Sequence, residues 1–533
     1  MRKNMVLKRS LIILLFFLSG ISLWAQEDIS YFRKIRIDQS EQIQGMYPLS
    51  PEDAEKVNSY KIMTMKDGRI SRIEYQRSGT SLADPVLGVP VIKFTYNGSY
   101  VRRTFLDSAG REIPDDQGIY SIRLKENSFG AVTASFHYDK YGNLMADRNG
   151  IASIMWNVNK NNRKVTALFF DPEGNRISNG KGVFEYKYLY DDRGNLSMIL
   201  QLDERGMPVD GSDGAAAVRR EWDEKGNLIR ESWLNSREEA VVNSNGVSST
   251  AYHWDDRGNR LLKVNFNPEG DLCTDRNGVV QYCWFYDDFG NRIREEHYDA
   301  VGNLTPDSKG IAVYRWIHYP QGNELEQNNM DSNLNLIQDE KGFASYRWVF
   351  DERGNITEEK YYDVDNTLKK DFWGIAMYRY SFNEAGNMKE SRSYSDYDEL
   401  IADNTGVAVY RWDYDLDGNK TSEMHFNNEE RPVENFEGIA SYIWDYDEEG
   451  NAVKQSQFGL YGQYKANSEG VAIYRWEYDK YGNTLSETYY GIDEQIVENR
   501  DGAAVAVWEY DEKGTPLKTS RFDRKKLPVE LTD

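Results

Sequence analysis

The stretch Gly406–Gly438 reads GVAVYRWDYDLDGNKTSEMHFNNEERPVENFEG, and it is one copy of a unit that recurs every 32 residues. Within it, Tyr410 and Trp412 alternate with Arg411 and Asp413. A period of two is typical of a β-strand whose two faces differ, because successive side chains point to opposite sides of the sheet. The stretch therefore predicts a strand with its aromatic rings on one face and its charges on the other.

Two series of glycines mark the period. The first runs in steps of 32 residues over fourteen positions from Gly98 to Gly514; thirteen are glycine, and the third is Asn162. The second runs from Gly118 to Gly502 and holds thirteen glycines. Glycine, and less often asparagine, adopts left-handed backbone conformations at little cost. Because no linker interrupts this register, the sequence predicts one repeat array in place of separate globular domains.

Each repeat contains two connections that can reverse the chain. The run Asp415–Asn419, Asp-x-x-Gly-Asn, predicts a type I turn closed by a G1 bulge, and Asp403–Gly406 predicts a second, looser turn. One repeat buries too little apolar surface to offset the entropy of ordering it, so stability must come from stacking neighbours. We expect an all-β fold, an elongated solenoid or spiral of stacked antiparallel β-hairpins with a 32-residue repeat.

Charged side chains recur in step with the turn glycine. An arginine stands seven residues before it and a glutamate five residues after it, which brings Arg411 nearly opposite Glu423. We interpret the two sets as cross-strand ion pairs on the face away from the rings, with a charged ligand stripe as the alternative. The arginines are Arg315, Arg347, Arg379, Arg411 and Arg475, and the glutamates are Glu295, Glu359, Glu423 and Glu487.

The aromatic residues of the alternating strand are the candidate binding residues. They are Tyr314, Trp316, Tyr346, Trp348, Tyr410, Trp412, Tyr442, Trp444, Tyr474 and Trp476. The alternation favours a structural role for most of these rings. Rings that stay exposed would offer flat surfaces for stacking against glycans or partner proteins.

Residues that carry catalysis or bind metals form no recognisable constellation. His137, His297 and His425 occupy the position that Tyr361 fills in another repeat, so we interpret them as substituted aromatics. The run Asp415–Asn419 resembles a calcium loop, but its counterparts in other repeats keep only the first ligand, so we interpret it as a plain turn. We predict a non-catalytic protein without cofactor or metal, and keep an enzyme as the least favoured class.

Cys273 and Cys283 are the only cysteines, and they flank the turn at Gly278. A cross-hairpin disulfide is geometrically possible if the register places the two Cα atoms within reach. The sequence leaves the bonded and the free state open.

The first 25 residues have the pattern of a secretory signal peptide. Basic residues at the start precede the apolar run Leu11–Leu18, and the small residue Ala25 stands at the presumed cleavage point. No later segment is apolar for the roughly 18 residues that a membrane-spanning helix needs. Without residues 1–25 the chain holds 61 basic and 87 acidic residues, a net charge of −26, which argues against nucleic acid as a partner. We expect an exported protein that is periplasmic, at the cell surface or secreted.

The rest of the chain divides into three parts. Residues 26–67 are expected to form an N-terminal cap, in which the run from Ser50 to Asp53 predicts a helix start with serine as N-cap and proline at the first helical position. Residues 68–97 look like a degenerate first repeat. Residues 98–533 form the tandem array of 32-residue YDxxGN repeats.

The Tyr-Asp-x-x-Gly-Asn motif resembles the YD, or RHS, repeats of bacterial surface and toxin-delivery proteins. It stands at Tyr190–Asn195, Tyr286–Asn291, Tyr446–Asn451 and Tyr478–Asn483. The resemblance implies hairpins wound into a continuous β-sheet spiral, which in that family can form a shell around a toxic cargo. This chain departs from the family in its longer period and in lacking a recognisable C-terminal core segment or cargo.

These observations lead to two expectations for function. The first is an exported, non-catalytic repeat scaffold for multivalent binding or adhesion to a polymeric glycan or a surface protein. The second is a structural or assembly component of the periplasm or cell envelope.

Overall fold

The computed structural model describes residues 28–37, 41, 43–77, 79–84, 88–320, 322–351, 355–384, 386–416, 418–447, 450–479, 483–510 and 516–529. Within these ranges one short helix, α1 (Pro51–Lys56), accompanies 34 β-strands. The predicted signal peptide lies outside the described residues, and the predicted boundaries of cap and first repeat stay predictions.

The strands join into one open, antiparallel sheet. In the first part they are β1 (Asp28–Ile37), β2 (Ile43–Leu49), β3 (Ser59–Thr64), β4 (Ile70–Arg77), β5 (Thr80–Ser81), β6 (Val91–Asn97), β7 (Tyr100–Leu106), β8 (Ser121–Glu126), β9 (Val132–Tyr138), β10 (Ser153–Val158), β11 (Lys164–Phe170) and β12 (Arg176–Ile177). Next come β13 (Glu185–Tyr190), β14 (Leu196–Leu202), β15 (Ala217–Trp222), β16 (Leu228–Leu234), β17 (Ser249–Trp254), β18 (Arg260–Phe266), β19 (Gln281–Tyr286), β20 (Arg292–Tyr298), β21 (Val313–His318), β22 (Glu324–Met330) and β23 (Ser345–Phe350). The remainder are β24 (Ile356–Tyr362), β25 (Met377–Phe382), β26 (Met388–Tyr394), β27 (Val409–Tyr414), β28 (Lys420–Phe426), β29 (Ser441–Tyr446), β30 (Ala452–Phe458), β31 (Ile473–Tyr478), β32 (Thr484–Tyr490), β33 (Val505–Tyr510) and β34 (Pro516–Phe522).

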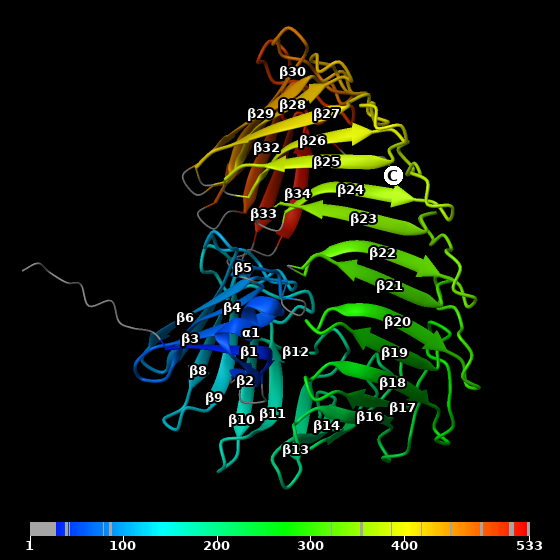
Figure 1. Cartoon of the computed structure of the whole chain (residues 1–533). Helices are drawn as coiled ribbons and strands as arrows, with labels where there is room; N and C mark the ends of the chain where they lie inside the picture. Colours follow the sequence, from blue (N-terminus) through cyan, green and yellow to red (C-terminus); the bar gives the residue numbers. More distant parts are fainter. Residues whose placement is uncertain are drawn as a thin grey trace, which may run out of the picture.

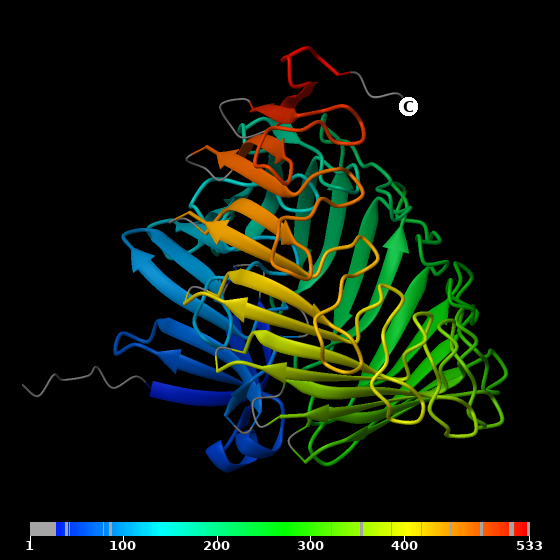
Figure 2. The same cartoon turned by 90° about the horizontal axis from the view of Figure 1, so that it is seen from above.

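The sheet is a spiral ribbon. From β13 to β34 each strand pairs with the next, so each repeat adds one hairpin. Figures 1 and 2 show the ribbon winding round until its orange and red end returns over the blue and cyan beginning. The Tyr141 hydroxyl donates to Asn451 Oδ1 at 2.5 Å, across 310 residues of sequence, which ties the two passes together. The predicted hairpin spiral is confirmed.

The predicted turn chemistry is also confirmed. Gly418 adopts φ +86°, and its amide donates to the Asp415 carbonyl at 3.2 Å. The register between β27 and β28 shifts by one residue beside Tyr414, as a G1 bulge requires. Gly406 closes the second turn with φ +88°.

A third left-handed position in each repeat was missed by sequence reasoning. In the repeat quoted above it is Glu430, with φ +57°. The series comprises Gly110, Gly142, Gly174, Gly206, Glu238, Gly270, Gly302, Leu334, Asn366, Asp398, Glu430, Gly462, Glu494 and Lys526. Half of its members are not glycine, so the glycine pattern that revealed the other two turns does not reveal this one.

The predicted pairing of arginine with glutamate within a hairpin is wrong. Glu423 lies opposite Trp412, and Arg411 lies opposite Met424. Counting outward from the turn glycine ignores the extra residue of the bulge, and an offset of one residue moves a side chain to the other face of the sheet. The arginines do lie on the face away from the rings. Arg411 binds Glu390 of the preceding hairpin at 2.6 Å and Glu430 at 2.6 Å.

We call the face that carries Tyr410, Trp412 and their equivalents the ring face. The N-terminal strands cover it in the first repeats. Lys34 Nζ of β1 lies 4.8 Å from the ring centroid of Trp254. Glu41 pairs at 3.1 Å with Lys164, whose ammonium lies 3.3 Å from the ring of Trp156. The main apolar cluster of the protein lies here, between this N-terminal segment and the first repeats.

The predicted helix start is confirmed: Ser50 Oγ accepts the Asp53 amide at 3.1 Å, and Pro51 opens α1. Long contacts then fix the N-terminal segment to turns of later repeats. Arg33 donates to the Gly290 carbonyl at 2.8 Å, and Arg77 donates to Asn291 Oδ1 at 2.5 Å. None of the described helices is long and apolar enough to cross a membrane.

Candidate functional site

The ten candidate aromatic residues form one row along the ring face. Tyr410 and Trp412, two positions apart on β27, stack with ring centroids 5.9 Å apart and planes 6° from parallel. The equivalent stacked pairs are Tyr282–Trp284, Tyr314–Trp316, Tyr346–Trp348, Tyr378–Tyr380, Tyr442–Trp444 and Tyr474–Trp476. Trp316 is buried, and the other nine candidates are half-buried. The rings therefore form a continuous wall whose edges remain accessible.

The polar atoms at the edges of these rings are held within the sheet. In the repeat of β27 the Tyr410 hydroxyl donates to Asp403 at 2.8 Å, and the Trp412 indole donates to Glu423 at 2.9 Å. Burial alone would raise the pKa of Glu423. Hydrogen bonds from His425, Lys420 and Trp412 outweigh burial and lower that pKa to about 2. Glu423 is therefore a carboxylate that anchors its neighbours.

The histidines take the places that sequence analysis assigned to them. His425 Nδ1 lies 3.0 Å from the Ile439 carbonyl, and Nε2 lies 3.1 Å from Glu423 Oε1. Its ring packs edge-on between Tyr410 and Tyr442, with centroids 5.3 and 5.7 Å away. His297 repeats this arrangement, with its own glutamate at 3.0 Å. These side chains link one stacked pair to the next.

A period of 64 residues, twice the repeat, is superimposed on the ring face. The position opposite the tryptophan alternates between an acid and a neutral residue: Glu295, Gln327, Glu359, Ser391, Glu423, Gln455 and Glu487. Two residues further on, a ring alternates with a residue without one: His297, Asn329, Tyr361, Ser393, His425, Gln457 and Tyr489. Sequence reasoning missed this alternation because it compared single repeats, although reading every second repeat shows it.

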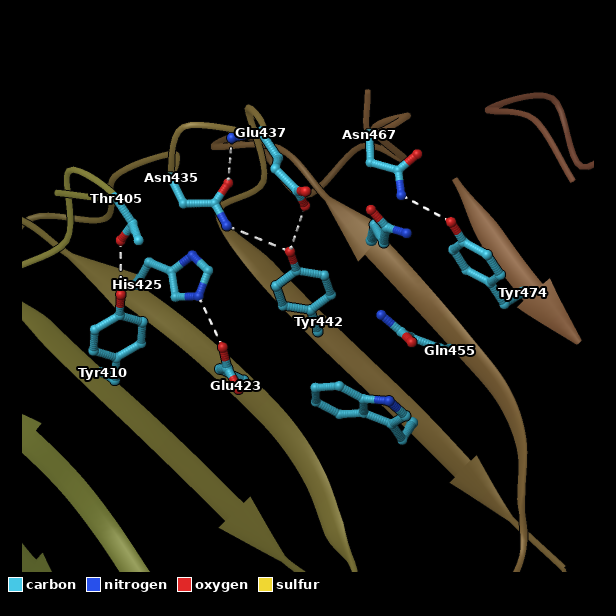
Figure 3. A pocket seen from close by; sticks show the side chains of 12 residues that line it. Thr405, Tyr410, Glu423, His425, Asn435, Glu437, Tyr442, Gln455, Asn467 and Tyr474 are labelled. Atoms are coloured by element: carbon cyan, nitrogen blue, oxygen red, sulfur yellow. Dashed lines mark hydrogen bonds and ion pairs between the residues drawn. The ribbon is translucent and has the colours of Figure 1, made fainter. Parts of the chain in front are cut away.

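Two cavities on the ring face include a step without a linking ring. The Gln457 pocket, of about 480 Å³, extends from Tyr410 and His425 past Tyr442 to Gln457 and Tyr474 (Figure 3). The Gln327 pocket, of about 260 Å³, lies between Tyr314 and Tyr346. Because an amide side chain fills less space than an aromatic ring, each such step leaves an opening in the wall.

The two cysteines and the calcium-like run are the remaining candidates. Cys273 and Cys283 are free, and burial raises the pKa of both thiols. Asp415, first residue of the calcium-like run, accepts the backbone and side-chain N–H groups of Asn419, each at 2.8 Å. Both of its oxygens thus serve the turn.

Comparison with known proteins gives distant structural matches. No protein-family model and no curated protein matches the chain. The crystal structure of TcdB2-TccC3-TEV matches with 10% identity and a TM-score of 0.34, over 93% of this chain and 26% of that one. The Tc holotoxin pore of Photorhabdus luminescens with a TccC3 mutation matches with 11% identity and a TM-score of 0.26, over 94% and 29%. A porin-like protein from Bacteroides uniformis matches with 8% identity and a TM-score of 0.13, over 63% and 88%.

This chain thus spans between a quarter and a third of the length of the two toxin chains. TM-scores this low carry no argument about function. The resemblance to YD and RHS repeats rests on the Tyr-Asp-x-x-Gly-Asn motif, and the hairpin spiral is the fold that this resemblance implies.

Proposed function

We propose that this chain is an exported, non-catalytic repeat scaffold that binds a polymeric glycan or a surface protein through several weak contacts along the spiral. The ring face carries the proposal. It presents an aromatic pair in the same orientation at seven successive repeats, from Tyr282 to Trp476. A polymer with a regular repeat meets equivalent surfaces at regular spacing along such a wall.

The state of the charged groups supports binding over catalysis. Glu423 is held as a carboxylate by three donors, and the hydroxyl of Tyr410 is committed to Asp403. A general acid or base needs a pKa near the working pH and a free path to substrate. The charged and hydroxyl groups on this part of the ring face are engaged in hydrogen bonds to neighbouring side chains of the sheet.

Multivalency follows from the repeat. When two contacts on one polymer bind the same scaffold, the second becomes intramolecular and gains from effective concentration. The experiment compares the full mature chain on mannan, laminarin and xylan with the hexasaccharide of each polymer. We expect the polymer to bind at least about tenfold more tightly, per chain of ligand, than its hexasaccharide. Equal affinity for polymer and hexasaccharide argues against multivalency, and newly formed reducing ends argue for an enzyme.

A structural or assembly component of the periplasm or cell envelope is the second candidate. The long contacts of Arg33 and Tyr141 with later repeats favour it, because they fasten one pass of the spiral to the next and stiffen the whole body. Rigidity of this kind suits a spacer. Retention of the chain in envelope fractions without affinity for any polymer favours this function.

A further inference from the structure

At most steps of the ring face the polar side chains satisfy one another. The step at Asn329 shows the pattern for a pair of neutral residues. The Trp316 indole donates to Gln327 Oε1, the Gln327 amide donates to Asn329 Oδ1, and the Asn329 amide donates to the Phe343 carbonyl, each at 3.1 Å. Tryptophan, two amides and the backbone thus form a closed chain of hydrogen bonds.

Four repeats later the same positions hold Trp444, Gln455 and Gln457, and the corresponding chain of hydrogen bonds is not formed. Within the described part of the protein, neither the Trp444 indole nor the two glutamine amides have a hydrogen-bond partner. Gln457 is only 1% exposed, and its Oε1 atom is buried without a partner. The two steps differ at the last position by one methylene, glutamine in place of asparagine.

An unpaired buried amide costs free energy, and a water molecule or a ligand that reaches it recovers part of that cost. Three side chains without a hydrogen-bond partner in the described protein line one opening, and of their polar atoms only Gln457 Oε1 is buried. Gln455, Gln457 and Trp444 line the Gln457 pocket. The rings of Tyr442 and Tyr474 lie on either side of Gln455 (Figure 3). The pocket volume of about 480 Å³ is within the usual range of small-molecule sites, about 300–1,000 Å³.

We propose that the Gln457 pocket is a binding site for a neutral, polyhydroxylated unit, such as an uncharged hexose of a glycan. Each free amide both donates and accepts, as each sugar hydroxyl does, and the indole supplies one more donor. Half-buried rings on both sides supply apolar surface for the C–H groups of a pyranose.

Charge narrows the ligand class. The residues lining the pocket include the carboxylates of Glu423 and Glu437 and no lysine or arginine. Lys420, beside the pocket, pairs with Glu423 at 2.8 Å and lies 4.3 Å from the ring centroid of Trp444, which leaves Glu437 as the carboxylate without a cation of its own in the lining. Phosphorylated or uronic-acid ligands would meet like charge there. The Gln327 pocket, by contrast, is flanked by Lys309 and Lys341. The Gln327 amide there already bonds Trp316 and Asn329.

This inference rests on the glycan-binding part of the proposed function and assigns it to one repeat. The experiment titrates the full mature chain by calorimetry with mannohexaose, laminarihexaose, xylohexaose and, as the charged probe, hexagalacturonate. We expect at least one neutral hexasaccharide to bind and hexagalacturonate not to bind. Absence of binding by all three neutral sugars, or equal binding of the charged probe, overturns the inference.

The decisive variant is Gln457→Asn, which recreates the step at Asn329 and closes the chain of hydrogen bonds. We expect it to lower the affinity for the neutral sugar about tenfold or more, because the ligand loses at least one hydrogen bond to a buried partner. The matched control, Asn329→Gln, should leave that affinity unchanged. Unchanged affinity in Gln457→Asn contradicts the inference.

A second variant keeps the test informative if Gln457→Asn does not fold. Gln455→Glu introduces the residue found at Glu423 and Glu487. Its carboxylate should accept a hydrogen bond from the Trp444 indole, as Glu423 and Glu487 accept one from Trp412 and Trp476. We expect the same loss of affinity. A gain of affinity with polymer length that neither variant changes leaves multivalency standing and overturns the pocket. If the variants lose hexasaccharide binding and the natural chain binds polymer and hexasaccharide equally, the pocket is supported and multivalency is overturned.

Discussion

At the scale of single residues, most tryptophans of the ring face are held by ring stacking and by a hydrogen bond from the indole N–H group. Trp412 stacks on Tyr410 and donates to Glu423. Replacing it with alanine removes the stacking partner, leaves a void and removes one of the three donors to Glu423. We expect Trp412→Ala to lower the free energy of unfolding by about 3 kcal/mol, measured by urea denaturation.

A matched pair of variants separates stacking from hydrogen bonding. Trp412→Phe keeps a ring and loses the donor, so its cost should be about 1 kcal/mol. Leu416→Ala, at a fully exposed position, should leave the midpoint unchanged. An unchanged midpoint for Trp412→Ala together with lost ligand binding would make the tryptophan a binding residue.

Glu423 makes the free energy of unfolding depend on pH. Its folded pKa of about 2 lies below the ordinary value of 4.5, so it contributes stability that is full above pH 4.5 and is lost as the pH falls toward 2. We expect Glu423→Gln to be less stable than the natural chain at pH 7 and to approach it near pH 2.5. Urea midpoints of both chains at the two pH values measure this. A difference that stays constant with pH contradicts the assignment of the low pKa.

At the scale of elements, the sequence predicts what local chemistry determines. The strand of Tyr410 and the turn at Gly418 follow from alternation and from one glycine, and the structure confirms both. The partner of Arg411 was predicted wrongly, because the count from the turn glycine left out the extra residue of the bulge that the same sequence predicts. The pocket at Gln457 depends on which hydrogen bonds remain unmade, and only the packed structure shows that.

The third left-handed position allows a direct test of backbone strain. Leu334 has φ +66° with an exposed side chain, so it bears the cost of a left-handed conformation without a packing gain. We expect Leu334→Gly to raise the free energy of unfolding by about 0.5–1 kcal/mol, measured by chemical denaturation. Val301→Gly serves as the control, because Val301 is exposed beside Gly302 and is absent from the positive-φ set. Loss of stability in Leu334→Gly would show that the turn does not strain its leucine.

At the scale of the whole molecule, contacts between passes of the spiral join repeats that are distant in sequence. Arg77 is 1% exposed and reaches Asn291 across 214 residues. Truncation to alanine should therefore loosen the later repeat as well as the N-terminal segment. We expect Arg77→Ala to speed amide exchange in β19 and β20 and to leave β27 and β28 unchanged, by hydrogen–deuterium exchange mass spectrometry.

Lys56→Ala is the control, because Lys56 pairs only with the exposed Glu52 of its own helix. It should leave exchange in β19 and β20 as it is. The same exchange rates in Arg77→Ala and in the natural chain would mean that the two passes are energetically independent. Sequence reasoning gave no sign of this contact, since neither residue departs from its local pattern.

The tie between Tyr141 and Asn451 bears on how such an array evolves. Tandem copies in a gene gain and lose units by unequal recombination, and a solenoid whose repeats touch only their neighbours tolerates this. Here one extra unit between the tied residues would carry Asn451 a full hairpin past its partner. Geometry thus fixes the number of repeats between these two residues, while the side-chain hydrogen bonds described for residues beyond β30 do not reach the first pass of the spiral. Length variation among descendants of this gene should therefore concentrate after that strand.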